Sequence, residues 1–468
     1  MIQTIRNAWK VPELKKKILF TIMALLIFRL GSAIPVPYID SKALSDYLAT
    51  QSGTILGLMN AMSGSAFTYA TVFALSIQPY INSSIIIQLL TVAIPALERL
   101  QREGGEEGRK KIASITRYTT VAIALLQGFG YYTMVKNLPG GGTLVDNAGL
   151  PGWWVGLVIV LSFTAGSAFL MWLGEQITEF GIGNGISIIL FAGIVSRFPQ
   201  MITDSITGVQ YWNNMNNGTV SEKTFTDLGM TAEQAAEQMK AYASRALAPW
   251  VIPLIVIGML ALVVFIVYIN NAERRLPVQY AKRVVGRKMY GGQSTHIPMK
   301  VSMSGVMPII FAQSIASLPA TVAAFTGHSN DTEGFWGGLM AVFDTSGIFY
   351  SIIYFLLIVG FSYFYSTMAF NPIEVANNLK KNGGFIPGLR PGKPTADFIT
   401  KVLNKITMFG ALYLSVVAIV PIITGNLVGY SSLAIGGTSV IIVVGVALET
   451  VKQMEAQMLM RHYKGFLE

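Results

Sequence analysis

Residues 249–270 read PWVIPLIVIGMLALVVFIVYIN, an apolar run without one charged side chain. A helix of about 20 such residues matches the thickness of the hydrocarbon core of a membrane. Hydrophobic residues make up 52% of the chain and charged residues only 12%, which excludes an ordinary soluble domain. We therefore predict an all-α polytopic membrane protein. The ten predicted transmembrane helices are 18–38, 70–95, 116–136, 152–173, 183–203, 249–270, 305–326, 347–370, 401–424 and 432–451.

The basic residues indicate how these helices are oriented. Of the 34 Lys and Arg residues, 27 lie in the N-terminal arm, in alternate loops or in the C-terminal tail. Positively charged loops remain on the cytoplasmic side of a membrane. Both termini are therefore predicted to be cytoplasmic, which agrees with an even number of spans.

One apolar segment, residues 54–67, is too short to cross a bilayer. It reads TILGLMNAMSGSAF and is interrupted by glycine and serine. Irregular backbone at membrane depth is tolerated only inside protein or beside a water-filled cavity. The segment predicts a re-entrant helix beside such a cavity. A helix lying on the membrane surface is the alternative, although the cationic face of such helices is missing.

Two loops on the predicted cytoplasmic side, 271–304 and 371–400, are long and basic. In the first, strand-capable arms flank Gly291-Gly292, which predicts a β-hairpin that turns at this dipeptide. In the second, Gly383-Gly384 and three prolines indicate a rigid, turn-rich excursion. Orientation alone explains basic loops, but this length and turn chemistry favour docking surfaces for a large, partly anionic partner.

Five blocks of sequence resemble the SecY family of protein-conducting channels, in order and at the spacing of that family. They cover nearly the whole chain. The blocks are IQPYINSSIIIQLL (77–90), EGRKKIASITRYTT (107–120), WLGEQITEFGIGNGISIILFAGI (172–194), ERRLPVQYAKRVVGRKMYGGQSTHIPMKVSMSGVMPIIFAQSI (273–315) and NPIEVANNLKKNGGFIPGLRPG (371–392).

The resemblance implies two pseudo-symmetric five-helix halves, 1–203 and 249–468, joined by an extracytoplasmic loop, 204–248. It also implies a pore closed at its waist by a ring of aliphatic side chains, which blocks ions by dewetting and yields to a passing polypeptide. The ring residues expected from the resemblance are Ile77, Ile81, Leu190, Ile310 and Ile442. From the residues alone, we expect Ile77 and Ile81 on one helix face, with Pro79 distorting the backbone between them.

The resemblance further implies a plug in the outer funnel and a lateral gate between spans 2 and 3 and spans 7 and 8. The plug residues are Leu56, Gly57, Leu58, Met59, Asn60, Ala61, Met62, Ser63, Gly64, Ser65 and Ala66. The gate residues are Asn82, Gln127, Gln313 and Leu318. The three polar ones are expected either to hydrogen-bond across the seam or to make ordinary helix-packing contacts.

The function implied is that of the central subunit of a translocase. It would carry secretory polypeptides across the cytoplasmic membrane of a bacterium and release membrane proteins laterally into the lipid. The partners implied are SecE-like and SecG-like membrane subunits, a SecA-like motor ATPase, the ribosome, signal sequences and nascent polypeptides. Arg287 and Arg390 match the family positions that engage the cytoplasmic partner, and their guanidinium groups suit phosphate and carboxylate alike.

The residues argue against two other classes of membrane protein. A secondary transporter of a small solute is the main alternative, but such proteins place ionisable groups near the midplane. Here Glu175 and Glu179 are expected in a short loop, and Glu449 at the cytoplasmic end of a span. No catalytic motif of an intramembrane enzyme is present. With no cysteine and three scattered histidines, neither a metal site nor a cofactor is expected.

Overall fold

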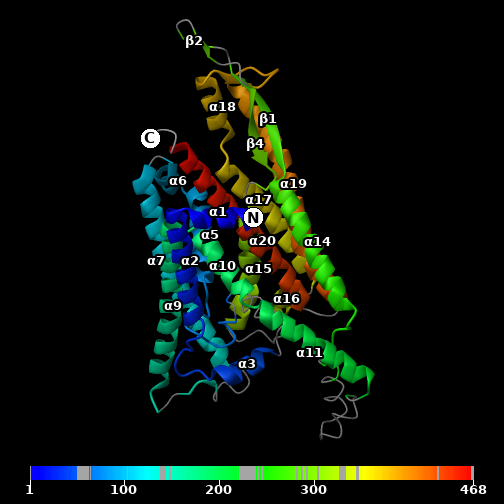
Figure 1. Ribbon diagram of the computed structural model, residues 1–468. Helices are drawn as coiled ribbons and strands as arrows, with labels where there is room; N and C mark the ends of the chain where they lie inside the picture. The colour runs from blue at the N-terminus through cyan, green and yellow to red at the C-terminus, as the bar shows by residue number, and fades with distance from the viewer. Residues whose placement is uncertain are drawn as a thin grey trace.

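The structure is a computed structural model of the 468-residue chain, and it is a bundle of long helices with a small β-sheet at one end (Figure 1). The described residues are 2–49, 63, 65–102, 104–137, 144–146, 149–218, 220, 239, 242–243, 246–280, 283–285, 288–290, 294–302, 305–325, 334–343, 347–428 and 432–464. We call the end where the sheet lies the sheet end.

The helices differ widely in length, from 8 residues in α6 to 36 in α19. Those of the first half of the chain are α1 (Ile2–Lys10), α2 (Pro12–Gly31), α3 (Ser41–Ala49), α5 (Gln78–Ala93), α6 (Pro95–Arg102), α7 (Gly105–Asn137), α9 (Gly152–Phe180), α10 (Gly185–Val195) and α11 (Phe198–Asn216). Those of the second half are α14 (Val251–Asn271), α15 (Met307–Phe325), α16 (Gly334–Val342), α17 (Ile348–Ala369), α18 (Pro372–Lys381), α19 (Lys393–Val428) and α20 (Ser432–Lys464).

Each of the ten predicted spans contains a helix. Within the described residues, 5 helices are long and apolar enough to cross a membrane, or up to 6 if the bent pair α5 and α6 is one span. The charges of Lys15, Lys16, Lys17 and Arg29 explain why α2 falls outside this group. The total of ten spans stays a prediction, because apolar length alone does not assign the remaining helices.

The second predicted span, 70–95, is only partly helical. Residues 72–77 form turns, Ser76 has a φ of 52°, and α5 begins at Gln78 and turns by 105° into α6. Pro79 lies in the first turn of α5, where its missing N–H costs nothing. We expected Pro79 to distort the backbone between Ile77 and Ile81. Instead it lies at the start of the helix and leaves the helix interior undistorted. The irregular backbone before it is buried, as membrane depth requires.

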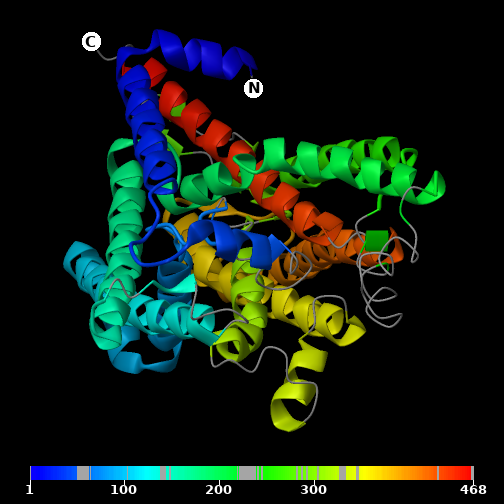
Figure 2. The same cartoon turned by 90° about the horizontal axis from the view of Figure 1, so that it is seen from below.

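The two halves of the chain meet along two seams. On one side, α15 packs against α5 and α7. On the other side, α20 packs against α10 and α1. Viewed from below, the helices of the first half and those of the second half lie around a common centre (Figure 2). We call these the α5–α15 seam and the α10–α20 seam.

The sheet joins the two long basic loops. Strand β1 (Glu273–Tyr280) pairs antiparallel with β4 (Ser294–Lys300) and also with the two-residue strand β5 (Gly384–Phe385) of the second loop. Leu276, Val278 and Met299 pack with Ile399 of α19 in one apolar cluster. The predicted hairpin is confirmed, and the second loop proves to be part of the same sheet.

The turn of this hairpin was predicted at the wrong dipeptide. Strand β2 (Arg283–Val285) pairs with β3 (Lys288–Tyr290), with Val285 opposite Lys288. The chain therefore reverses between Val285 and Lys288, and Gly291-Gly292 falls between β3 and β4 in the sequence. The β2–β3 pairing continues the register of the β1–β4 pairing, and this register determines where the chain reverses.

The chain after α10 differs from a simple loop. Helix α11 continues to Asn216, so the first part of the predicted loop 204–248 is helical. Thr231 and Gln234 have the spacing of a capping box and predict a short helix that ends near Leu247, but most of this segment lies outside the described residues.

Candidate functional site

The five predicted ring residues are all buried and share one apolar cluster. None of them is more than 3% exposed. Ile77 and Ile81 belong to the start of α5, Leu190 to α10, Ile310 to α15 and Ile442 to α20, and all five are members of the largest apolar cluster. Both halves of the chain therefore contribute to this cluster.

Local sequence places Ile77 and Leu190 at this centre. The N–H of Ile81 donates to the carbonyl of Ile77 at 3.1 Å, which keeps the two side chains at helical spacing although Ile77 precedes α5. Before Leu190, the Asn184 side chain accepts hydrogen bonds from the N–H groups of Ile186 and Ser187 and caps α10.

Glycine allows α10 to approach α9 closely. Gly183 has a φ of 83°, which a residue with a side chain rarely adopts. A Cβ at Gly185 would overlap the carbonyl oxygen of Gly174, and a Cβ at Gly174 would lie 3.6 Å from Cδ1 of Ile77. The glycines thus bring Leu190 and Ile77 into the same apolar cluster.

Most of the predicted plug lies outside the described residues, which include only Ser63, Ser65 and Ala66 of Leu56 to Ala66. The Ser63 hydroxyl accepts a hydrogen bond from the N–H of Phe67 at 3.0 Å. The Ser65 hydroxyl donates to Oε1 of Gln200 in α11 at 3.1 Å.

A buried tyrosine anchors the backbone directly after this segment. Tyr131 of α7 donates its hydroxyl proton to the carbonyl of Phe67 at 2.6 Å, and the two rings meet edge to face with centroids 4.8 Å apart. Both residues are at most 1% exposed. The C-terminal end of the predicted plug is therefore tied to α7.

The four predicted gate residues lie on α5, α7 and α15, three helices that pack against one another. Asn82 is buried, and the amide oxygens of Gln127 and Gln313 are buried without a partner among the described residues. Leu318 is 40% exposed and lies eight residues beyond Ile310, about 12 Å along α15. Leu318 thus lies well beyond ring residue Ile310 along α15.

A polar contact that the sequence did not reveal crosses the same seam. Tyr365 of α17 donates its hydroxyl proton to Oε1 of Gln88 in α5 at 2.8 Å. The Tyr365 ring also contacts Phe311 of α15, with centroids 5.2 Å apart. The only signal in the sequence was a glutamine inside an apolar span, and nothing there identified its partner.

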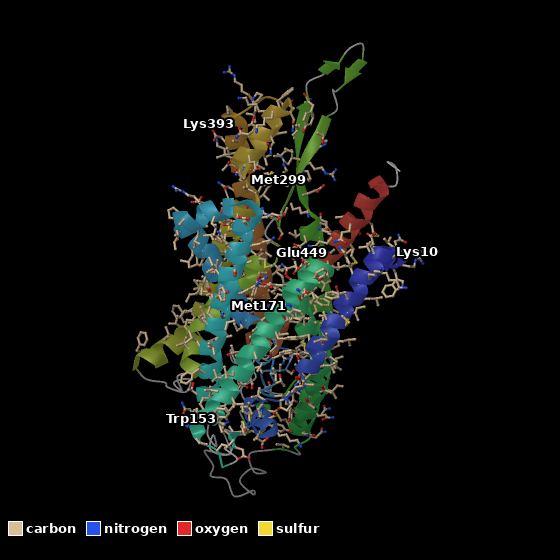
Figure 3. The ribbon with its side chains drawn as sticks, turned by 90° about the vertical axis from the view of Figure 1, so that its left-hand side faces the viewer. Lys10, Trp153, Met171, Met299, Lys393 and Glu449 are labelled. Carbon is tan, nitrogen blue, oxygen red and sulfur yellow. The ribbon has the colours of Figure 1, made fainter. Side chains whose placement is uncertain are left out.

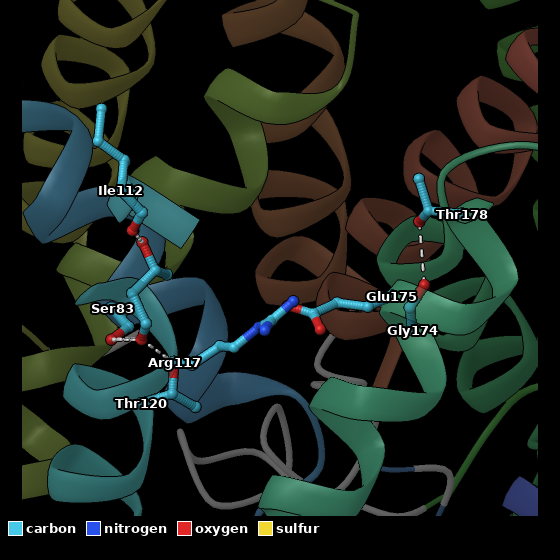
Figure 4. Close-up of polar contacts among 8 residues, drawn as sticks. Ser83, Ile112, Arg117, Thr120, Gly174, Glu175 and Thr178 are labelled. Carbon is cyan, nitrogen blue, oxygen red and sulfur yellow. Dashed lines mark hydrogen bonds and ion pairs between the residues drawn. The ribbon is translucent and has the colours of Figure 1, made fainter. Parts of the chain in front are cut away.

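An ion pair joins α7 to α9, and its Arg117 side chain is exposed. Nε of Arg117 in α7 lies 2.9 Å from Oε1 of Glu175 in α9, and the Ser83 hydroxyl of α5 donates to the carbonyl of Thr116 beside it (Figure 4). Glu175 and Glu179 are in α9 and not in a short loop. The error arose because the apolar run ends near 173 whereas the helix continues to Phe180, where Gly181 ends it.

The sheet end is basic and exposed. Figure 3 shows Lys393 at this end and Trp153 at the opposite end. Arg390 is exposed, and its carbonyl accepts a hydrogen bond from the Thr395 hydroxyl at 2.8 Å, which holds the backbone there. Arg287 lies outside the described residues. Of the two residues predicted to contact a cytoplasmic partner, only Arg390 is therefore among the described residues.

A groove of about 420 Å³ opens where α14, α20 and the sheet meet. Nζ of Lys452 donates there to the carbonyl of Asn270 at 3.2 Å. Partial burial and the nearby Lys300 lower the pKa of Lys452. The groove contains both acidic and basic groups, Glu273 and Glu455 besides the two lysines, and no cluster of acidic or histidine side chains in the described residues could hold a metal ion.

Comparison with known proteins identifies the family. The family model described as SecY matches residues 71–451. The "Protein translocase subunit SecY" of Streptomyces galbus is 42% identical, and the alignment covers 100% of both chains.

Solved structures share the fold. A protein-conducting channel superimposes with a TM-score of 0.59 at 17% identity, covering 95% of this chain and 92% of that one. Sec61 in the canine ribosome-channel complex from the endoplasmic reticulum superimposes with a TM-score of 0.57 at 16% identity, with the same coverage. These likenesses support a mostly helical membrane protein with several spans.

Proposed function

The chain belongs to the SecY family and is a protein-conducting channel subunit of the Sec translocase, and we propose that its pore closes at Ile77, Ile81, Leu190, Ile310 and Ile442. The observation that carries this proposal is the burial of all five side chains in one cluster to which both halves contribute. An aliphatic constriction excludes ions by dewetting, while its flexible side chains part for a polypeptide. This family forms a translocation pore and not an enzyme.

The proposed route has a second exit, sideways into the lipid. It passes through the α5–α15 seam, where α15 contacts both α5 and α7. Apolar helices separate at small cost when an apolar segment takes the place of their mutual contacts, because lipid and helix are similarly apolar. This seam is the proposed lateral gate for signal sequences and membrane segments.

The sheet end is the proposed docking surface for the partners that deliver the polypeptide. Arg274, Arg275 and Arg390 are exposed there, and the Sec61 neighbour was solved bound to a ribosome. Guanidinium groups bind both the phosphates of ribosomal RNA and the carboxylates of a SecA-like motor. SecE-like and SecG-like subunits complete the proposed assembly.

We place the chain in the cytoplasmic membrane of a bacterium, with both termini and the sheet end in the cytoplasm. Thr4 of α1 donates to Oε1 of Glu455 in α20 at 3.0 Å, so the first and last helices lie together. The excess of basic residues near the sheet end supports this orientation.

A vesicle experiment tests the channel. Full-length chain reconstituted with its membrane partners should translocate a secretory precursor only with a motor and ATP. Gradient-driven uptake of a small solute without precursor translocation would support the alternative, a secondary transporter.

The same vesicles test the plug. Deletion of Leu56–Ala66 should raise the ion conductance of the resting channel, because the plug no longer fills the outer funnel. An equally long deletion of residues 222–232 in the outer loop is the control and should leave the conductance low. Equal conductance in the two deletion variants would reject the plug assignment.

A further inference from the structure

Helix α11 carries an exposed row of apolar side chains. The helix runs sideways from the bundle at the end opposite the sheet (Figures 1 and 2). Phe198, Ile202 and Ile206 recur at every fourth position, and all three are exposed, with Ile202 at 62%. Residues four positions apart lie on the same side of a helix. We call these three side chains the α11 stripe.

The other side of α11 is polar and almost uncharged. Thr203, Thr207 and Gln210 are exposed there, and Asp204 is the only charged residue of the helix. The helix is therefore amphipathic. It lacks the basic residues with which many helices on membrane surfaces bind anionic headgroups.

The chain that returns from α11 to α14 packs on a different side of α11. The N–H of Leu247 donates to the carbonyl of Gly208 at 2.9 Å. The rings of Tyr242 and Tyr211 meet edge to face with centroids 4.6 Å apart, and Nδ2 of Asn214 donates to the Tyr242 hydroxyl at 3.3 Å. These contacts leave the α11 stripe open, because Gly208 follows its last residue by two positions, about half a helical turn.

The same packing determines the depth of α11 relative to the membrane. Leu247 lies three residues before Trp250, the N-cap of α14. Helix α14 is long and apolar enough to cross a membrane, and few of its side chains are buried by protein, so most of them face lipid. Trp250 is exposed, and tryptophan is enriched where a span meets the membrane–water interface. The bond between Leu247 and Gly208 therefore holds the middle of α11 at the level where α14 enters the membrane.

We propose that α11 is an interfacial helix that inserts the α11 stripe among the acyl chains of the membrane leaflet at this end. In the proposed orientation this is the outer leaflet. Lipid is the occupant that the structure favours, because the stripe lies at the level of the lipid-facing surface of α14. An amphipathic helix at this level lies with its apolar face below the headgroups and its polar face in water. The inserted helix anchors the connection between the two halves of the chain to the membrane surface.

Spin labels on neighbouring residues test this position. The chain contains no cysteine, so Ile202→Cys places a label on the α11 stripe and Thr203→Cys places one on the polar side. In vesicles that contain the full-length chain with its membrane partners, molecular oxygen concentrates among the acyl chains, whereas a nickel chelate stays in water. Oxygen should relax the label at Ile202→Cys more strongly than the nickel chelate does, and this order should reverse at Thr203→Cys. Ile206→Cys and Thr207→Cys repeat the comparison about one helical turn further along.

Three other results would each overturn the proposal. Stronger relaxation by the nickel chelate at both Ile202→Cys and Thr203→Cys would place α11 in water. Stronger relaxation by oxygen at both would place the whole helix in the hydrocarbon layer. Protection of Ile202→Cys from both reagents would show that protein, either another subunit or a second copy of this chain, covers the stripe.

The charge of the lipid provides a further test. Because α11 has no basic residue, the contrast between Ile202→Cys and Thr203→Cys should be the same in phosphatidylcholine vesicles and in vesicles that also contain phosphatidylglycerol. A contrast that required phosphatidylglycerol would overturn insertion through the apolar stripe. All of these measurements are made without translocation, so their outcome is independent of the proposed channel function.

Discussion

At the scale of single residues, buried hydroxyl groups hold the irregular backbone before α5 by donating hydrogen bonds to its carbonyl groups. The turns before α5 are buried in the bundle, where carbonyl groups depend on donors from the protein. Tyr131 satisfies the carbonyl of Phe67, and the Ser167 hydroxyl donates to the carbonyl of Ser76 at 3.2 Å. Side chains of α7 and α9 thus replace the hydrogen bonds that a continuous helix would have made.

We predict that Tyr131→Phe destabilises the protein by about 1–3 kcal/mol, because the buried carbonyl of Phe67 loses its donor. The thermal unfolding midpoint of the purified protein measures this loss. Tyr132→Phe changes the neighbouring tyrosine, which is only partly buried, and should have a smaller effect. Equal decreases in the two variants would contradict the role given to the Tyr131 hydroxyl.

At the scale of elements, the sheet end is a small structure built on the bundle. Strand β5 belongs to the second loop and pairs with β1 of the first, while α18 and α19 cover the sheet through Leu379 and Ile399. Both loops therefore present their basic residues from one rigid support. A rigid support reduces the ordering cost of binding a partner.

Arg390→Glu should weaken binding of ribosomes or of a SecA-like motor to vesicles containing the channel by about tenfold. The reversed charge repels phosphate and carboxylate groups, and the difference from the wild type should shrink at high salt. Lys42→Glu is the control, because Lys42 of α3 is exposed and lies at the end of the bundle opposite the sheet. Equal loss of binding in both variants would indicate a general effect of charge.

At the scale of the whole molecule, the two seams differ in their polar ties. On the α10–α20 side, Thr4 bonds to Glu455, and Nζ of Lys17 donates to Oε1 of Gln457 at 3.5 Å. On the α5–α15 side, Tyr365 bonds to Gln88. We expect the first side to act as the hinge and the second side to open.

Cross-linking on each side distinguishes hinge from gate. A bifunctional thiol reagent that joins Thr4→Cys to Glu455→Cys should leave precursor translocation intact, because these residues stay together. The same reagent joining Leu90→Cys of α5 to Met368→Cys of α17, both exposed, should block precursor translocation. If only the cross-link between Thr4→Cys and Glu455→Cys blocked translocation, the α10–α20 seam would be the one that opens, which would contradict the prediction.

The class of this protein follows from its sequence, because hydropathy is a local property that needs no knowledge of tertiary contacts. The apolar runs predict where helices occur, and a helix is found in every one of them. The sequence predicts the wrong helix boundary where polar residues continue a helix, as at Glu175, and where a proline starts one, as at Pro79. The aliphatic ring could be named only through resemblance, since isoleucine is common in every span.

The contacts between the halves were decided by tertiary structure alone. Gln88 and Tyr365 are 277 residues apart, and no periodicity relates them. The two-residue strand β5 carries no pattern of its own, and it exists because β1 offers free backbone groups at its edge. Arg117 and Glu175 are 58 residues apart, and the packing of α7 against α9 brings their side chains within 2.9 Å of each other. Interactions between distant segments depend on the arrangement of the whole bundle, which local sequence does not encode.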